Sequence, residues 1–144
     1  MSLTSSWVFW ALLSACFAAL TAVLAKAGLQ QVNPDFATFV RTGFILVFLS
    51  VFLTVMQQWE NPAGLHRRTW VLLLLSGLAT GASWLCYFRA LKIGNAYQVA
   101  PVDKLSVVLV AVFAFAFLGE RPAGRDWLGI ALITAGVIVM VLKR

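Results

Sequence analysis

The sequence predicts an all-α, polytopic membrane protein that crosses the bilayer five times. Of its 144 residues, 62% are hydrophobic and only 11% are charged, and the mean hydropathy is +0.92. Soluble domains carry about 45–50% apolar and about 25% charged residues, so this composition indicates an integral membrane protein. Five apolar runs approach the roughly 20 residues that a span requires, and lipid leaves a chain that forms no barrel only the helix.

Each apolar run supplies one predicted helix. The first begins at Trp7 and carries no charge until Lys26, and the second is interrupted only by Arg41. The connectors contain Pro, Gly and Asn, and Asn33-Pro34 is a good helix start. Such short connectors leave no room for a soluble domain, so we expect a single transmembrane domain over residues 1–144. The expected helices cover approximately residues 7–26, 35–58, 69–90, 97–118 and 127–142.

The formal net charge of +6 does not indicate a nucleic-acid partner, because the basic residues mostly flank the apolar runs. The partner that this arrangement predicts is the lipid bilayer. The basic residues divide almost evenly between the two membrane faces, which leaves two alternatives open. The chain inserts with its C-terminus in the cytoplasm, or it inserts both ways and pairs with an antiparallel copy.

Asp103 and Lys104 stand side by side in the fourth run, where charges are costly. Neighbours on a helix point about 100° apart, so we expect each to find its own partner. If the helix begins at Pro101, Asp103 lies in its first turn and Lys104 reaches the interface. If the helix begins near Asn95 and breaks at Pro101, Asp103 lies at depth beside freed backbone, as in many transporters.

Two more cations, Lys26 and Arg41, approach from the same predicted membrane face as Asp103 and Lys104. One carboxylate among three cations leaves positive charge that could hold an anionic group. Two alternatives stay open for Asp103. It forms a structural bridge with Lys26 or Arg41, or these groups handle substrate or protons.

Three aromatic residues, Trp10, Trp84 and Tyr87, are candidates for lining a cavity for an aromatic or cationic ligand, although lipid-facing aromatics are common. The sequence contains no HExxH, GxSxG or P-loop motif, and no second carboxylate near Asp103 in sequence. We therefore expect no catalytic, metal or cofactor site, and no enzyme activity. Proton coupling is compatible with this expectation.

Small residues mark faces on which helices could pack closely. Gly77 and Gly81 form a GxxxG pair in the third run, and Gly129 and Gly136 lie about two turns apart in the fifth. These faces indicate either a dimer seam or ordinary packing within one chain.

Three segments carry a resemblance to a known family. "WALLSACFAALTAVLAKAGL" resembles the opening helix of the EamA-type repeat of the drug/metabolite transporter superfamily, and "FATFVRTGF" is similar to the start of its second helix. The most specific segment is "WLCYFRALKIGNAYQVAPVDKLSVVLVAVFAFAFLGERPAGRDWLGIALITAGVIVMV", with its "LGE" and "GIALITAGV". Typical members carry two repeats in about ten helices, so the chain resembles the shorter members with one repeat of five helices.

This resemblance implies half of a ten-helix drug/metabolite transporter fold in a cell membrane of the bacterial inner-membrane type. It implies a secondary transporter that exports small metabolites or drugs as a homodimer, by alternating access. The alternative from another class is a non-transporting accessory or assembly subunit, packed through its small-residue faces. The resemblance names no substrate.

Overall fold

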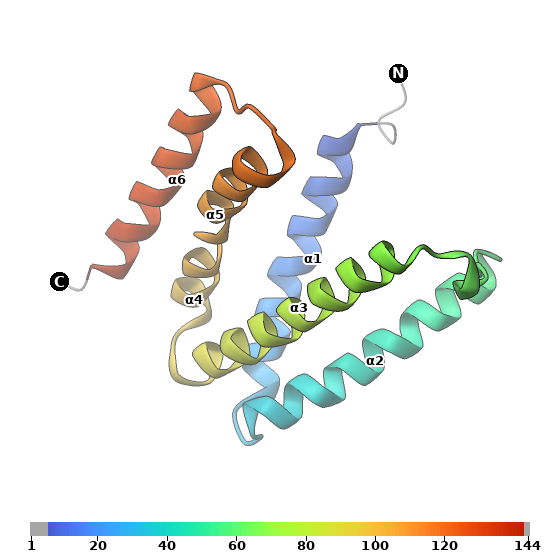
Figure 1. Cartoon of the computed structure of the whole chain (residues 1–144). Coiled ribbons are helices and arrows are strands. Elements are labelled where there is room, and N and C mark those ends of the chain that lie inside the picture. The colour runs from blue at the N-terminus through green and yellow to red at the C-terminus, as the bar shows by residue number, and fades with distance from the viewer. Residues whose placement is uncertain (1–5, 143–144) are drawn as a thin grey trace. The chain divides into compact units, whose positions relative to one another are not determined.

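The computed structural model describes residues 6–142, and every regular element within that range is a helix (Figure 1). Five helical stretches are long and apolar enough to cross a membrane, which confirms the predicted fold class. The fourth stretch, Ala96–Leu118, is built from two α-helices and a π-helix. The elements are α1 (Trp7–Gly28), α2 (Pro34–Val55), the 3₁₀ turn η2 (Pro62–Gly64), α3 (Arg67–Ile93), α4 (Ala96–Asp103), α5 (Ser106–Phe113), the π-helix η3 (Ala114–Leu118) and α6 (Gly124–Val141).

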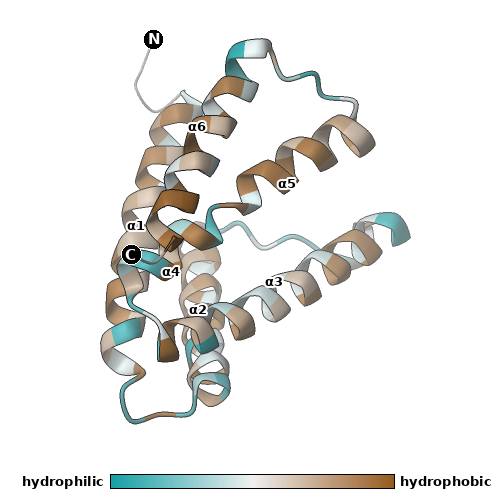
Figure 2. Ribbon diagram, turned by 90° about the vertical axis from the view of Figure 1, so that its left-hand side faces the viewer, coloured by the Kyte–Doolittle hydropathy of each residue, from teal (hydrophilic) through white to brown (hydrophobic). Residues whose placement is uncertain are grey.

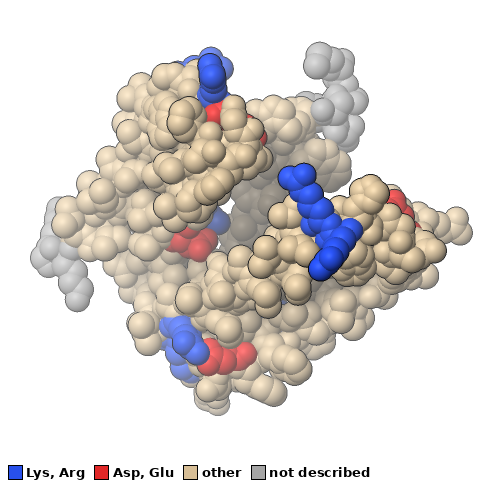
Figure 3. All heavy atoms as spheres, in the orientation of Figure 1, with Lys and Arg blue, Asp and Glu red and all other residues tan. Residues whose placement is uncertain are grey.

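The surface of these helices is that of a multi-pass membrane protein. Figure 2 shows helices that are hydrophobic along most of their length, with hydrophilic residues at their ends and in the connectors. On α2, Phe39 and Phe44 are 74% and 73% exposed, which is favourable only against lipid or another apolar surface. On the face shown in Figure 3, charged side chains form a few small groups among mostly uncharged residues.

The chain divides into two compact units. The α2–α3 unit is Ala25–Ile93, and the α4–α6 unit comprises residues up to Leu24 together with those from Gly94 onward. In the α2–α3 unit, α2 packs alongside α3 (Figure 1). Its buried residues are few and gather near the start of α2 and the end of α3. They are Leu29, Thr38, Phe88 and Leu91.

In the α4–α6 unit, α6 packs against α4 and α5. The fourth span begins at Ala96, which agrees with the alternative that placed its start near Asn95. The interruption comes at Lys104 and Leu105 rather than at Pro101 itself. Pro101 has no N–H to continue the α-helical ladder, and the backbone then tightens into 3₁₀-type bonds. Lys104 N donates to Pro101 O and Leu105 N to the next carbonyl, each at 3.0 Å.

The helix ends follow from local sequence. The side chain of Asn33 caps α2 by accepting from the amides of Asp35 and Phe36 at 2.9 and 3.3 Å, and Pro34 occupies the first helical position. The π-helix ends at Gly119, whose φ of 72° lies in the left-handed region that favours glycine.

Candidate functional site

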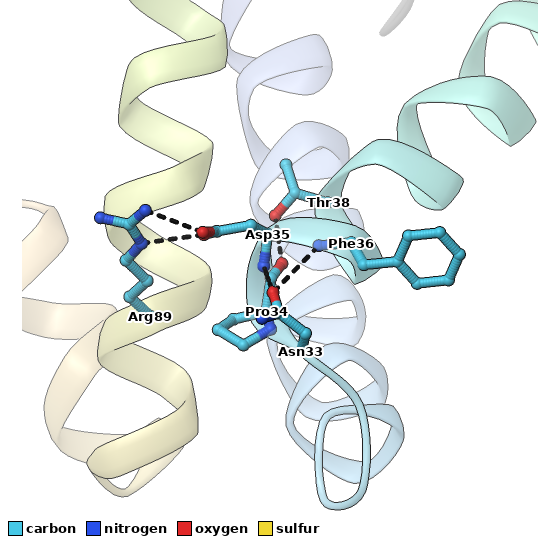
Figure 4. Close-up of polar contacts among 6 residues, drawn as sticks. All are labelled: Asn33, Pro34, Asp35, Phe36, Thr38 and Arg89. Atoms are coloured by element: carbon cyan, nitrogen blue, oxygen red, sulfur yellow. Dashed lines mark hydrogen bonds and ion pairs between the residues drawn. The ribbon is translucent and has the colours of Figure 1, made fainter.

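The N-terminal turn of α2 is tied to the last turns of α3 by an ion pair. Arg89 donates from Nε and Nη2 to the two carboxylate oxygens of Asp35, both at 2.8 Å (Figure 4). This bidentate geometry is the one in which a guanidinium holds a carboxylate most specifically. Thr38, which is buried, donates from Oγ1 to Pro34 O at 2.8 Å and secures the same turn.

Two lysines bind backbone carbonyls reciprocally between α1 and α3. Lys92, near the end of α3, donates from Nζ to the carbonyls of Leu29, Gln30 and Val32 in the connector that follows α1. Lys26, near the end of α1, donates from Nζ to Leu91 O at 2.7 Å. Each ammonium group therefore meets the negative end of the other helix, where a cation is favourable.

Arg41 lies on α2 with its guanidinium over two aromatic rings of α3. Its Cζ is 4.5 Å from the centroid of Trp84 and 5.3 Å from that of Phe88. Phe88 is buried, and Trp84 and Arg41 are partly buried. The structure thus joins Arg41 and Trp84, which the sequence indicated separately. Tyr87 lies beside Phe88, with ring centroids 6.4 Å apart.

Asp103 and Lys104 bind each other, with Nζ and Oδ2 3.3 Å apart. The expectation that each finds its own partner is therefore wrong. The reason is that α4 ends at Asp103, so Lys104 is a capping residue and its long side chain folds back to the preceding carboxylate. Lys26 and Arg41 belong to the other unit, and a bridge from Asp103 to either stays a prediction.

The remaining sequence candidate, Trp10, packs edge-to-face on Phe9 in the α4–α6 unit, with centroids 5.4 Å apart. It is 59% exposed. Its part in a ligand cavity stays a prediction. Within residues 6–142, no group of three or more His, Cys, Asp or Glu side chains is arranged to hold a metal ion.

Sequence reasoning missed Asp35, Arg89 and Lys92 as members of one cluster. In the sequence, Asp35 stands next to Pro34 at the start of the second apolar run, and Arg89 and Lys92 are among the basic residues that flank the apolar runs. A signal was present, because Arg89 and Lys92 are three residues apart and so share one face of α3. Their partners, a carboxylate and backbone carbonyls of a connector, could not be read from that spacing.

These features define a multi-pass membrane protein of tightly connected helices with one interrupted span. The sequence profile of the EamA-like transporter family matches residues 5–142. The chain therefore belongs to the EamA-like transporter family, which confirms the resemblance and indicates a transporter rather than an enzyme. No solved structure matches the chain.

Three relatives show the range of sizes in the family. An uncharacterized transporter in the cobO 3' region of Sinorhizobium sp is 55% identical over 140 residues, which cover 97% of this chain and 99% of the relative. The uncharacterized transporter YxxF of Bacillus subtilis (strain 168) is 29% identical over 143 residues, 99% of this chain but 44% of the relative. The probable 4-amino-4-deoxy-L-arabinose-phosphoundecaprenol flippase subunit ArnE of Salmonella paratyphi C (strain RKS4594) is 33% identical over 108 residues, 68% of this chain and 95% of the relative.

Proposed function

We propose that the protein is a secondary transporter that exports small metabolites or drugs across the cytoplasmic membrane by alternating access. The observation that carries this proposal is the interruption of the fourth span at Lys104 and Leu105, next to an ion pair. Transporters build substrate and coupling-ion sites from such discontinuous helices, because interrupted backbone and embedded charges can face a cavity rather than lipid.

The position of Asp103 suits a coupling group. It lies seven residues after Ala96, about 10 Å along the helix axis from the start of the span. Its partner Lys104 is its immediate neighbour, and the Asp103 side chain is 37% exposed. A carboxylate that is paired but accessible can exchange its partner for a proton or a substrate amine. We therefore assign the coupling step to Asp103. We assign to Lys104 the role of pairing with the Asp103 carboxylate when no proton or substrate is bound, and the step requires no cofactor.

We further propose that the working unit is a homodimer, which an antiparallel arrangement of two copies would complete. Family members of very different length support this proposal. The Sinorhizobium relative has the length of this chain, whereas the aligned residues cover only 44% of the Bacillus relative. Two copies of the five-span fold would supply the ten helices that the family resemblance implies for members with two repeats.

The test is flux in liposomes that contain the purified protein and a pH-sensitive dye. A panel of metabolites and drugs is supplied under an imposed proton gradient. We expect substrate-dependent proton movement that Asp103→Asn abolishes and Asp103→Glu partly preserves, because the amide cannot carry the proton that a carboxylate can. Glu60→Gln, in the connector between α2 and α3, makes the same change of charge and serves as the control. Unchanged flux in a folded Asp103→Asn protein contradicts the assignment.

A second candidate is a subunit that assembles with a different membrane protein. One relative, ArnE, is named as a flippase subunit. The face of α3 that carries Gly77 and Gly81 also leaves room for a partner, because a Cβ built at either glycine meets no atom of the described residues within 4 Å beyond the neighbouring turns of its own helix. Persistent inertness in liposomes, together with a co-purifying larger membrane protein that restores flux, would favour this candidate over the homodimer.

A further inference from the structure

Arg41 differs from the other cations at its end of the α2–α3 unit, because no carbonyl or carboxylate of that unit accepts a hydrogen bond from it. Lys26 and Lys92 donate to backbone carbonyls, and Arg89 donates to Asp35. Within the α2–α3 unit, the guanidinium of Arg41 contacts two aromatic rings and makes no hydrogen bond or ion pair. Its N–H donors are therefore not taken up by any carbonyl or carboxylate of the α2–α3 unit.

The carboxylates of the unit cannot neutralise Arg41. Both oxygens of Asp35 are held by Arg89. Glu60 lies beyond the other end of α2, which ends at Val55, fourteen residues and about 21 Å along the axis from Arg41. The positive charge of Arg41 is therefore unbalanced within its unit.

The position of Arg41 along α2 makes its lack of a hydrogen-bonded partner in the unit important. Arg41 is seven residues after Pro34, about 10 Å along α2 from the first helical residue. An ionised side chain at that depth is costly and calls for a partner. The rings of Trp84 and Phe88 offset part of that cost through cation–π contact.

The cation–π contact also leaves the guanidinium able to bind a ligand. A cation–π contact needs no hydrogen-bond acceptor, so the five N–H donors of the planar guanidinium are not taken up by a carbonyl or carboxylate of the unit. This in-plane fork matches the two oxygens of a phosphate or carboxylate. A lysine at this position would supply a charge but not the fork.

We propose that Arg41, supported by Trp84 and Phe88, binds the oxyanion group of the substrate, a phosphate or carboxylate. This inference rests on the proposed transport function and adds to it a substrate class, an anionic or zwitterionic molecule. The phosphate form has two possible sources, a soluble phosphate compound and an amphiphile with a phosphate headgroup.

Binding to the protein in a neutral detergent tests the site directly, with thermal unfolding as the readout. The probes are decyl phosphate, inorganic phosphate and the uncharged decyl glucoside. We expect decyl phosphate, inorganic phosphate or both to stabilise the protein, and Arg41→Gln to weaken that binding by about tenfold or more. Stabilisation by decyl phosphate alone identifies an amphiphilic ligand, and stabilisation by both identifies the phosphate group itself.

Two further variants make the result specific. Arg41→Lys keeps the charge and should still weaken binding, and it carries the test if Arg41→Gln does not fold. Arg68→Gln, in the first turn of α3, removes an arginine from the other end of the unit and should bind like the wild type. Equal phosphate affinity in the wild type and a folded Arg41→Lys protein, or equal stabilisation by decyl glucoside, overturns the inference.

The outcomes separate this inference from the proposed function. Substrate flux in liposomes that is insensitive to Arg41→Lys would overturn the oxyanion site and leave the transporter standing. Arg41-dependent binding without flux of any compound would support the site and count against a transporter that acts alone.

Discussion

Replacing Lys92 by methionine tests whether the reciprocal lysine contacts hold the ends of α1 and α3. Methionine keeps an unbranched side chain of similar length and removes the ammonium group. The substitution deletes the three hydrogen bonds from Nζ to the carbonyls of Leu29, Gln30 and Val32. It also removes one of the two cations near the end of α1, where Lys26 remains.

The size of the effect follows from the surroundings of the three carbonyls. The bond to Leu29 is partly buried, whereas those to Gln30 and Val32 are exposed, and water or headgroups replace exposed bonds at little cost. An acceptor left unsatisfied in a partly buried site costs about 1–3 kcal/mol. The lost helix-end charge adds about 0.3–1 kcal/mol. We therefore expect Lys92→Met to lower the free energy of unfolding by about 2 kcal/mol.

The assay is unfolding by a denaturing detergent in mixed micelles, followed by far-ultraviolet circular dichroism. Arg125→Met is a suitable control, because the Arg125 side chain is 92% exposed and lies in the other unit. Exposed substitutions of this kind change stability by no more than about 0.5 kcal/mol. A loss for Lys92→Met no larger than that of the control would refute the structural role of the contact.

Two other variants address the ion pair and the proposed dimer. Asp35→Asn removes the charge that Arg89 holds, so we expect a lower free energy of unfolding in the same assay. The double variant Asp35→Arg with Arg89→Asp exchanges the two residues and should recover part of this loss. An exchange that recovers none of it argues against a specific pair. Gly77→Leu adds bulk at a position where a Cβ meets no atom of the described residues within 4 Å beyond the neighbouring turns of its own helix, so its helix should fold normally while a dimer that uses this face weakens. Light scattering during size-exclusion chromatography measures the dimer, and an unchanged dimer excludes this face as the seam.

The fold could be predicted because the bilayer restricts a chain that spans it to very few kinds of structure. A charge-free run such as the one that begins at Trp7 must form a helix, so run length and connector chemistry are sufficient to count the spans. The start of the second helix at Asn33-Pro34 could also be predicted, because a capping side chain and a proline act on the residues next to them. The interruption after Asp103 was harder to predict, because it depends on how the backbone relaxes beyond Pro101.

The candidate site was harder to predict because contacts between helices depend on how each helix is rotated about its axis. Arg41 and Trp84 were both indicated by the sequence, as a charge at depth and as an aromatic residue. Forty-three positions separate them, and only the packing of α2 on α3 places the guanidinium over the ring. The pairing of Asp35 with Arg89 depends on the same packing.

The charges at the α1–α2 connector show that position in a span does not by itself separate structural from functional groups. Lys26, Lys92 and Arg89 all lie in transmembrane helices, and each is satisfied by a carbonyl or carboxylate of its own unit. Such groups have little capacity left for a ligand, because binding one would first break an existing contact. Arg41 also carries a positive charge, but its contacts with the two rings include no hydrogen bond that a ligand would first have to break. Whether a charged group already has its hydrogen bonds is therefore the better criterion, and it selects Arg41 from this cluster.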